Sequence, residues 1–316
     1  MGISYNGRNW WQNAFAWSGT ALPLCYFRIA IATLYCICIL LISRLGIHQG
    51  WFTEGVTDES TVDAFGHSVL GSLIGFLLVF RMNASNARFW EGRSLWGTII
   101  NASRNLVRAG SEHTRDGEEL ADLTAGFAIC LKCSLRGSRD LEEAAPFLPE
   151  SLMQSAENFG NQPTAVAAAM TEWVARHSRS GQLDPEMTRH LESQIAVLVD
   201  AQGGCEKIQK TPLPFAYVSM IKLLILVYLA TLPLVLSDRF GWWAPMLMAV
   251  LSLGMFGIEE ASVDIEDPFG RNANCIDLDT LTLTVTRDTG QLARFATARW
   301  AAEDAAEGDN SDTSVS

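Results

Sequence analysis

The sequence predicts an all-α membrane protein with four transmembrane helices per subunit and a helical cytosolic region. Two observations predict this class. First, the apolar residues, 48% of the 316, gather in four long blocks instead of being spread along the chain. Second, the stretches between these blocks repeat apolar residues every three or four positions and carry few strand signals. Charged residues make up only 18% of the chain, below the usual quarter for a soluble domain.

The four apolar blocks are the candidate membrane spans, since a helix crosses a bilayer with about 20 apolar residues. Arg28 is the one charged residue in the first span, and Lys222 is the one in the third. The fourth begins beside Trp242 and Trp243, where an interfacial aromatic belt would lie. The spans are placed at residues 21–43, 64–80, 215–237 and 240–258.

The basic residues predict the orientation of the spans. Arginines follow the second span at positions 81, 88, 93, 104 and 108, whereas the loop before it is acidic, with Glu54, Asp58, Glu59 and Asp63 against Arg44. Cytoplasmic loops carry the excess of Lys and Arg. We therefore expect a multi-pass protein with both termini cytoplasmic, in a bacterial inner (plasma) membrane or an algal internal membrane.

The cytosolic region is predicted to consist of helices within residues 81–210 and 259–300. One helix starts at Asp184, which caps it, with Pro185 in the first turn, and Gly203-Gly204 is expected to end it. Another is predicted from Pro163 to about His177. We expect residues 1–300 to form a single domain and the acidic residues 301–316 to be a disordered tail.

Several function classes are disfavoured by the sequence. It contains no phosphate-binding glycine loop, no metalloprotease motif and no nucleophile elbow, so we expect no enzyme activity. The net charge of −12 argues against a nucleic-acid-binding protein. The Cys130–Cys133 spacing resembles a redox or zinc dithiol, but no second cysteine pair or nearby histidine completes a site, which favours buried, reduced thiols.

The second span carries a four-residue repeat of Ser72, Phe76 and Phe80, which places these residues on one helix face. One interpretation is a core stripe packed against a neighbouring helix. The other is a pore: copies of the helix around an axis would make apolar rings that gate by dewetting. The edges of the aromatic rings carry partial positive charge and could pass a weakly hydrated anion.

The segment after this span, residues 80–97, reads FRMNASNARFWEGRSLWG. It resembles the bestrophin family of ion channels and follows the pattern of prokaryotic and algal members without a gap. Residues 211–217 (TPLPFAY) are similar to the family's entry into the third span, and residues 260–270 (EASVDIEDPFG) to its acidic segment after the fourth. Together with the Asn9-Trp10 start, these blocks cover most of residues 5–290.

The resemblance implies a bestrophin-like homopentamer around a central pore. Its neck would lie at Ser72, Phe76 and Phe80, with a second, cytosolic aperture at Leu213. A structural charge network would hold a helical bend below the membrane; its members are Arg81, Arg88, Glu91 and Arg93. Two departures stand out: Ser72 is small and polar where a bulky residue is common, and Asn86-Ala87 replaces the frequent Tyr-Asp.

Calcium is a further expectation from the family, because animal bestrophins bind it through acidic residues after the fourth span. The matching candidates are Glu260, Asp264, Glu266 and Asp267. They do not form the unbroken acidic run of the animal proteins, so a solvated or arginine-paired acidic face is favoured over a metal site, and no cofactor is required.

The function that the sequence favours is passive conduction of chloride or bicarbonate through a hydrophobic neck, with the lipid membrane and further copies of the chain as partners. Two alternatives stay open. The first is a sodium-selective channel of the same family, which the acidic composition allows. The second is a non-conducting membrane scaffold whose cytosolic helices bind a partner.

Overall fold

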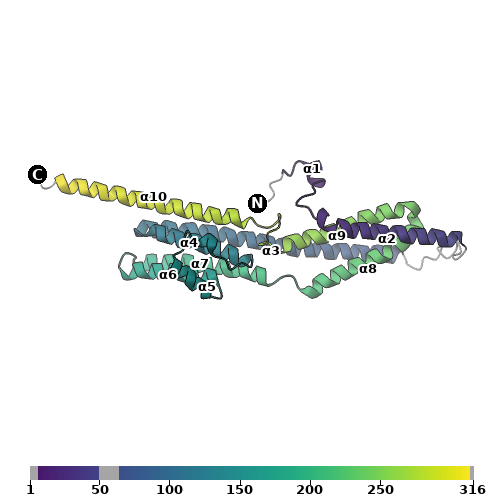
Figure 1. Ribbon diagram of the computed structural model, residues 1–316, viewed down its shortest axis with the longest axis horizontal. Coiled ribbons are helices and arrows are strands. Elements are labelled where there is room, and N and C mark those ends of the chain that lie inside the picture. The colour runs from purple at the N-terminus through teal and green to yellow at the C-terminus, as the bar shows by residue number, and fades with distance from the viewer. Residues whose placement is uncertain (1–5, 50–63, 314–316) are drawn as a thin grey trace.

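The computed structural model describes residues 6–49 and 64–313, which are helical throughout apart from short connections. Figure 1 shows an elongated molecule with a group of helices at each end. We call the end that holds the four apolar spans the apolar half and the other end the second helical half. The α-helices are α1 (Trp10–Ala14), α2 (Leu22–His48), α3 (Ala64–His113), α4 (Gly117–Leu135), α5 (Glu150–Asn158), α6 (Gln162–Arg179), α7 (Pro185–Lys210), α8 (Phe215–Phe240), α9 (Ala244–Glu266) and α10 (Leu278–Thr313). The acidic loop at residues 50–63, used above for the orientation, lies outside the described residues.

The apolar half confirms the four predicted spans. Helices α2, α8, α9 and the first part of α3 are each long and apolar enough to cross a membrane. Their shared core is formed by residues such as Cys36, Ile74, Ile225, Leu229 and Met248. The turn between the last two spans lies at the short 3-10 helix Gly241–Trp243, a few residues after the predicted boundary.

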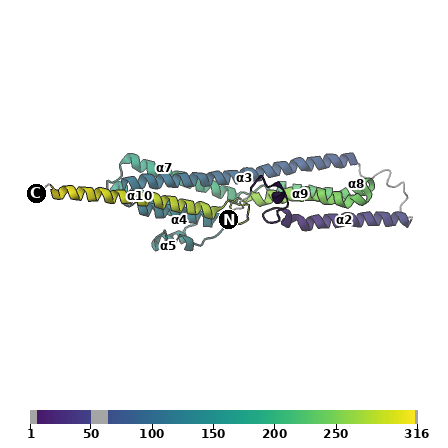
Figure 2. The ribbon, with the colours of Figure 1, turned by 90° about the horizontal axis from the view of Figure 1, so that it is seen from above.

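Helix α3 is the element that joins the two halves. It is one unbroken helix of 50 residues, about 75 Å long at 1.5 Å per residue. Figures 1 and 2 show it running from the apolar half into the second helical half. The family resemblance implied a bend below the membrane, but the helix passes this level without interruption. The same helix therefore positions side chains on both sides of the membrane boundary.

The second half packs α4, α6, α7 and α10 around the continuation of α3. Its core contains large, fully buried side chains, among them Trp96, Phe127 and Trp173. The predicted helix start at Asp184 is confirmed, since its carboxylate accepts the backbone N–H of Met187 at 2.7 Å. The helix predicted from residue 163 to about 177 corresponds to α6.

The predicted end of α7 at Gly203-Gly204 is wrong, because the helix continues to Lys210. Tertiary packing explains the difference. A Cβ atom on Gly204 would lie 2.8 Å from the Leu95 side chain of α3, so glycine here allows the two helices to approach closely. The buried face of α7 also continues beyond the glycines with Cys205 and Ile208.

The acidic C-terminal segment also differs from the expectation, because α10 continues as far as Thr313 instead of ending near residue 300. The alanine-rich stretch after Trp300 contains no helix breaker until Gly308. Its start is held to the end of α3: the Trp300 Nε1–H donates to the carbonyl of Ser111 at 3.1 Å, and Arg115 pairs with both oxygens of Asp304 at 2.6 and 2.7 Å.

Two glycines inside helices give a stability test. A Cβ on Gly126 would lie 2.6 Å from Leu148 Cγ, whereas nothing lies within 4 Å of one on Gly203. We expect Gly126→Ala to lower the free energy of unfolding by about 1–3 kcal/mol through overpacking. Gly203→Ala should raise it by about 0.5–1 kcal/mol, because alanine favours the exposed helix. Thermal unfolding of the purified protein measures both, and equal effects would contradict the packing described.

Candidate functional site on helix α3

One face of α3 is uncovered along most of its length. Thirteen exposed residues follow one another at spacings of three or four. At 3.6 residues per turn these residues fall within a sector of about 80° around the helix axis. We call this set the exposed stripe of α3: Phe65, Val69, Ser72, Phe76, Phe80, Asn83, Ala87, Trp90, Ser94, Thr98, Asn101, Asn105 and Arg108.

The predicted neck residues lie on this stripe. Phe76 and Phe80 are 66% and 62% exposed, while Ile74 and Leu78 on the opposite face are buried in the apolar core. The interpretation of these residues as a stripe packed in the core of a single chain is therefore excluded. Ser72 is also exposed, and its hydroxyl donates to the carbonyl of Ser68 at 2.9 Å within the helix.

The chemistry of the stripe changes along the helix. From Phe65 to Phe80 it is apolar except for Ser72, and from Asn83 onward it is mostly polar and uncharged. It contains no Asp or Glu, and its one charged residue is Arg108 at the far end. The chain as a whole has 35 acidic residues, so this face differs sharply from the average surface.

Where the apolar part of α3 ends, a group of charged side chains joins the four spans; we call it the Glu259 cluster, formed by Arg28, Arg81, Lys222, Glu259, Glu260 and Glu266. The Glu259 carboxylate, 3% exposed, lies 2.7 Å from the Arg81 guanidinium and 3.6 and 3.5 Å from Arg28 and Lys222. These cations come from α2, α3 and α8, while the carboxylate belongs to α9. One buried acid thus contacts all three other spans.

Two neighbouring carboxylates complete the cluster. Glu260 pairs with Arg28 at 2.6 Å, and Glu266 lies 3.8 Å from Arg81. Arg81 is itself 1% exposed, and its Nε is buried with no hydrogen-bond partner in the described chain. The buried guanidinium therefore depends on its two carboxylate neighbours for compensation.

The other predicted members of the charge network have partners on different helices. Arg88 donates to the carbonyls of Glu266, Thr211 and Ile208 at 3.0, 2.5 and 2.8 Å, which holds the end of α7 against α9. Glu91 pairs with Lys207 of α7 at 2.8 Å. Arg93 is exposed, with no ion pair to another described residue. Within the described chain, the four residues do not pair with one another.

The segment that joins α7 and α8 lies near the middle of the long axis (Figure 1), and Leu213 belongs to this segment. It is partly buried, and its backbone N–H donates to the Glu266 carboxylate at 3.1 Å. Arg88, which holds the same segment through Thr211, lies two helical turns after Phe80. The aperture assigned to Leu213 stays a prediction that rests on the resemblance.

The four calcium candidates do not form a ligand cage in the structure. Glu260 and Glu266 belong to the Glu259 cluster. Asp264 accepts hydrogen bonds from the side-chain amides of Asn272 and Asn274, and Asp267 accepts the backbone N–H of Phe269 at 3.2 Å. Within residues 6–49 and 64–313, no three His, Cys, Asp or Glu side chains converge on one point. Calcium binding therefore stays an expectation that rests on the family resemblance.

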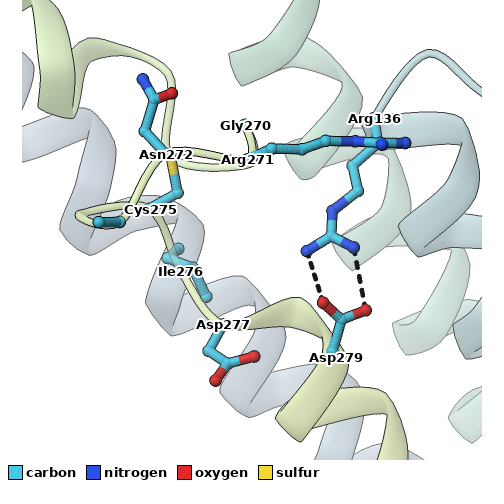
Figure 3. A pocket seen from close by; sticks show the side chains of 9 residues that line it. Arg136, Gly270, Arg271, Asn272, Cys275, Ile276, Asp277 and Asp279 are labelled. Carbon is cyan, nitrogen blue, oxygen red and sulfur yellow. Dashed lines mark hydrogen bonds and ion pairs between the residues drawn. The ribbon is translucent and has the colours of Figure 1, made fainter. Parts of the chain in front are cut away.

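A pocket of about 360 Å³ lies beside the loop that follows α9 (Figure 3). Unlike the calcium candidates, its lining includes arginine side chains. Arg136 and Arg271 reach into it, and Arg136 forms two hydrogen bonds with the Asp279 carboxylate at 2.9 and 3.0 Å. The Arg136 guanidinium, with Lys132, lowers the pKa of Asp279 to about 2. Arg136 and the ionised Asp279 carboxylate neutralise each other here. We therefore interpret this contact as one that holds α4 and α10 together.

The cysteine pair of α4 is confirmed as buried, free thiols. Cys130 and Cys133 are both buried and unbonded, as are four of the other five cysteines, and Cys38 is free and exposed. Burial raises the pKa of Cys130 to about 12, so its thiol stays protonated at neutral pH. Such a thiol is a poor nucleophile and metal ligand.

Comparison with known proteins shows which family this chain belongs to. The family described as Bacterial/Fungal Bestrophin protein matches residues 3–291. The chain belongs to the bestrophin family. The blocks at residues 80–97, 211–217 and 260–270 therefore lie inside a family-wide match, and the resemblance drawn from them is confirmed.

Relatives and solved structures of bestrophins agree with this assignment. A voltage-dependent anion channel-forming protein of Nostoc sp. is 30% identical over 297 residues, covering 92% of this chain and 93% of the relative. A protein of the same description from Mesorhizobium japonicum is 32% identical over 276 residues, covering 86% of both. A crystal structure of a bacterial bestrophin homologue from Klebsiella pneumoniae matches with a TM-score of 0.77 and 25% identity, covering 85% of this chain and 98% of that one.

Sequence reasoning missed the central role of Glu259 in this bestrophin. It assigned the partners of Arg81 to its own helix, whereas Glu259 lies 178 positions away in the sequence. A usable signal was present, because Arg28 and Lys222 are the lone charges of two otherwise apolar spans. Charged residues within membrane segments pair with one another, so each lone cation predicts an acidic partner on another span.

Two neighbouring glutamates test the Glu259 cluster. We expect Glu259→Gln to lower the free energy of unfolding by about 3–5 kcal/mol, because it leaves the buried Arg81 without its closest counter-ion. Glu260→Gln, the matched control, should cost about 1 kcal/mol or less, since its partner Arg28 is half exposed. Thermal unfolding in detergent compares the two, and a control as destabilised as Glu259→Gln would refute the central role of that residue.

Proposed function

We propose that this bestrophin is a homopentameric anion channel that conducts chloride or bicarbonate through a pore lined by the exposed stripe of α3. The observation that carries the proposal is the absence of any carboxylate on that stripe, in a chain with 35 acidic residues. A surface of this kind does not repel an anion along its path. The descriptions of the relatives as anion channel-forming proteins support the same ion class.

An exposed stripe on a single helix needs further copies to enclose a path. One chain leaves Phe76 and Phe80 uncovered on a helix whose other face is buried in the core. Five copies around an axis would bring these side chains together as successive apolar rings. A narrow apolar constriction controls conduction through its wetting, and aromatic edges attract a weakly hydrated anion. Ser72, which is smaller, would widen the pore on the outer side of the neck.

The stripe then leads into a polar cytosolic vestibule. Below Phe80 it presents amide and hydroxyl side chains and ends at Arg108. Glu91 lies just outside the stripe and is neutralised by Lys207. Fixed positive charge without competing acids raises the local anion concentration. We place this vestibule, and with it both termini, on the cytoplasmic side, because the arginines that follow the second span lie there.

Ion selectivity is tested directly with purified protein in planar bilayers. In a gradient of potassium chloride, we expect the reversal potential to move toward the chloride equilibrium potential, and in a bicarbonate gradient toward that of bicarbonate. A reversal potential that follows sodium or potassium would instead assign the chain to the cation-selective alternative. A protein that is folded and oligomeric but electrically silent would favour the scaffold.

The neck is tested by shortening its two aromatic residues. We expect the double variant Phe76→Ala/Phe80→Ala to raise single-channel conductance at least about twofold, because the apolar constriction widens and stays wet. Phe159→Ala is the control, since this phenylalanine is 47% exposed at the end of α5, away from α3. Currents of the double variant that match those of the parent and of the control would place the constriction elsewhere.

A further inference from the structure

We infer that Asn83 is a specificity-determining residue, whose side-chain amide supplies hydrogen-bond donors to the anion as it leaves the neck; this rests on the proposed pore. Asn83 is the first polar residue of the exposed stripe after Phe80. Three residues correspond to about 4.5 Å along the helix, so the amide lies directly below the last apolar ring. An ion that has lost part of its hydration in the neck meets this group first.

The amide of Asn83 is available for that contact. The side chain is exposed, and it makes no hydrogen bond with another residue of the described chain. By contrast, the polar group before the neck is engaged within its own helix, since the Ser72 hydroxyl donates to Ser68. The Asn amide offers two N–H donors, the groups that a chloride or bicarbonate ion needs in place of water. The free donor therefore lies on the vestibule side.

The charged groups of α3 near Asn83 are paired elsewhere and leave its N–H donors without a competing carboxylate. The neighbouring cation Arg81 points to the opposite face, where it is buried against Glu259 at 2.7 Å. The nearest carboxylate along the exposed side of α3 is Glu91, which pairs with Lys207. No free carboxylate from α3 competes with the permeating anion for the N–H groups, so the donors face an uncharged, mostly polar surface.

This role predicts a dependence on anion hydration. A strongly hydrated anion needs replacement donors more than a weakly hydrated one does. Loss of the amide should therefore penalise chloride and bicarbonate more than thiocyanate. A purely steric role for Asn83 would change the currents of all anions of similar size together, which separates the two explanations.

Three variants of the full-length protein in planar bilayers test the inference. With Asn83→Leu, which has nearly the same size but no donors, we expect chloride conductance to fall about tenfold, the factor expected for losing one hydrogen bond to a charged group. The thiocyanate-to-chloride permeability ratio should rise. Asn83→Gln keeps both donors and should retain at least half of the parent's conductance. Asn86→Leu, the matched control on an exposed asparagine outside the stripe, should conduct like the parent.

The outcomes separate this inference from the proposed function. If the parent conducts anions but Asn83→Leu keeps both its conductance and its permeability ratio, the inference is overturned and the channel proposal stands. Equal losses in Asn83→Leu and Asn86→Leu also overturn it. A parent that conducts cations or nothing overturns the channel proposal itself. Size-exclusion elution and thermal unfolding identify any variant that fails to fold, and in that case Asn83→Ala, which also lacks a side-chain donor, replaces Asn83→Leu, with the same fall and the same rise expected.

Discussion

The fold depends on the ion pair between Arg81 and Glu259, which lies where the apolar half meets the second helical half. Burying two charges costs several kcal/mol each unless partners compensate them. Here Arg28 and Lys222 add two further cations around the same carboxylate, and Glu266 adds a second acid beside Arg81. Helices in lipid gain little from apolar contact with one another, so polar contacts fix how they are aligned. One carboxylate on α9 thereby sets the relative height of four spans.

The alignment of the spans leaves α3 with two contrasting faces. Its inner face is buried successively in the apolar core, in the Glu259 cluster and in the core around Trp96. Its outer face remains free over the same length. Because the helix is unbroken, the free face keeps one direction from Phe65 to Arg108. The packing of one side is therefore what leaves the other side free as one continuous stripe, the surface on which the proposed pore depends.

Much of this architecture could be predicted from local sequence signals. The four spans follow from long apolar runs, α6 follows from the segment predicted from Pro163, and the start of α7 follows from Asp184, whose carboxylate caps it. The stripe of Ser72, Phe76 and Phe80 follows from helical spacing alone. Errors arose where packing decides the outcome. Gly204 suggests a helix end from the sequence, but in the structure it is the position where Leu95 packs against α7. The alanine-rich acidic segment after Trp300 suggests a disordered tail, but in the structure it continues α10.

The partners in the charge network were predicted wrongly, because they are remote in the sequence. The family pattern identified Arg81 and Arg88 as structural but assigned their pairing to residues of the same helix. In the structure, Arg81 meets a carboxylate on α9, and Arg88 meets backbone carbonyls that carry no sequence signal at all. The charged partners nevertheless lie at blocks that the sequence had already marked. Glu259 directly precedes residues 260–270, Glu266 belongs to them, and Lys207 shortly precedes residues 211–217.

The unbroken α3 has a mechanical consequence. Because α3 is one helix from Ala64 to His113, Phe76 and Phe80 belong to the same continuous element as its far end. The end near His113 is held by Trp300 and lies beside the Arg115–Asp304 pair, while the middle is held through Arg81. Helix α10 and the Glu259 cluster therefore hold the same helix at two separate levels.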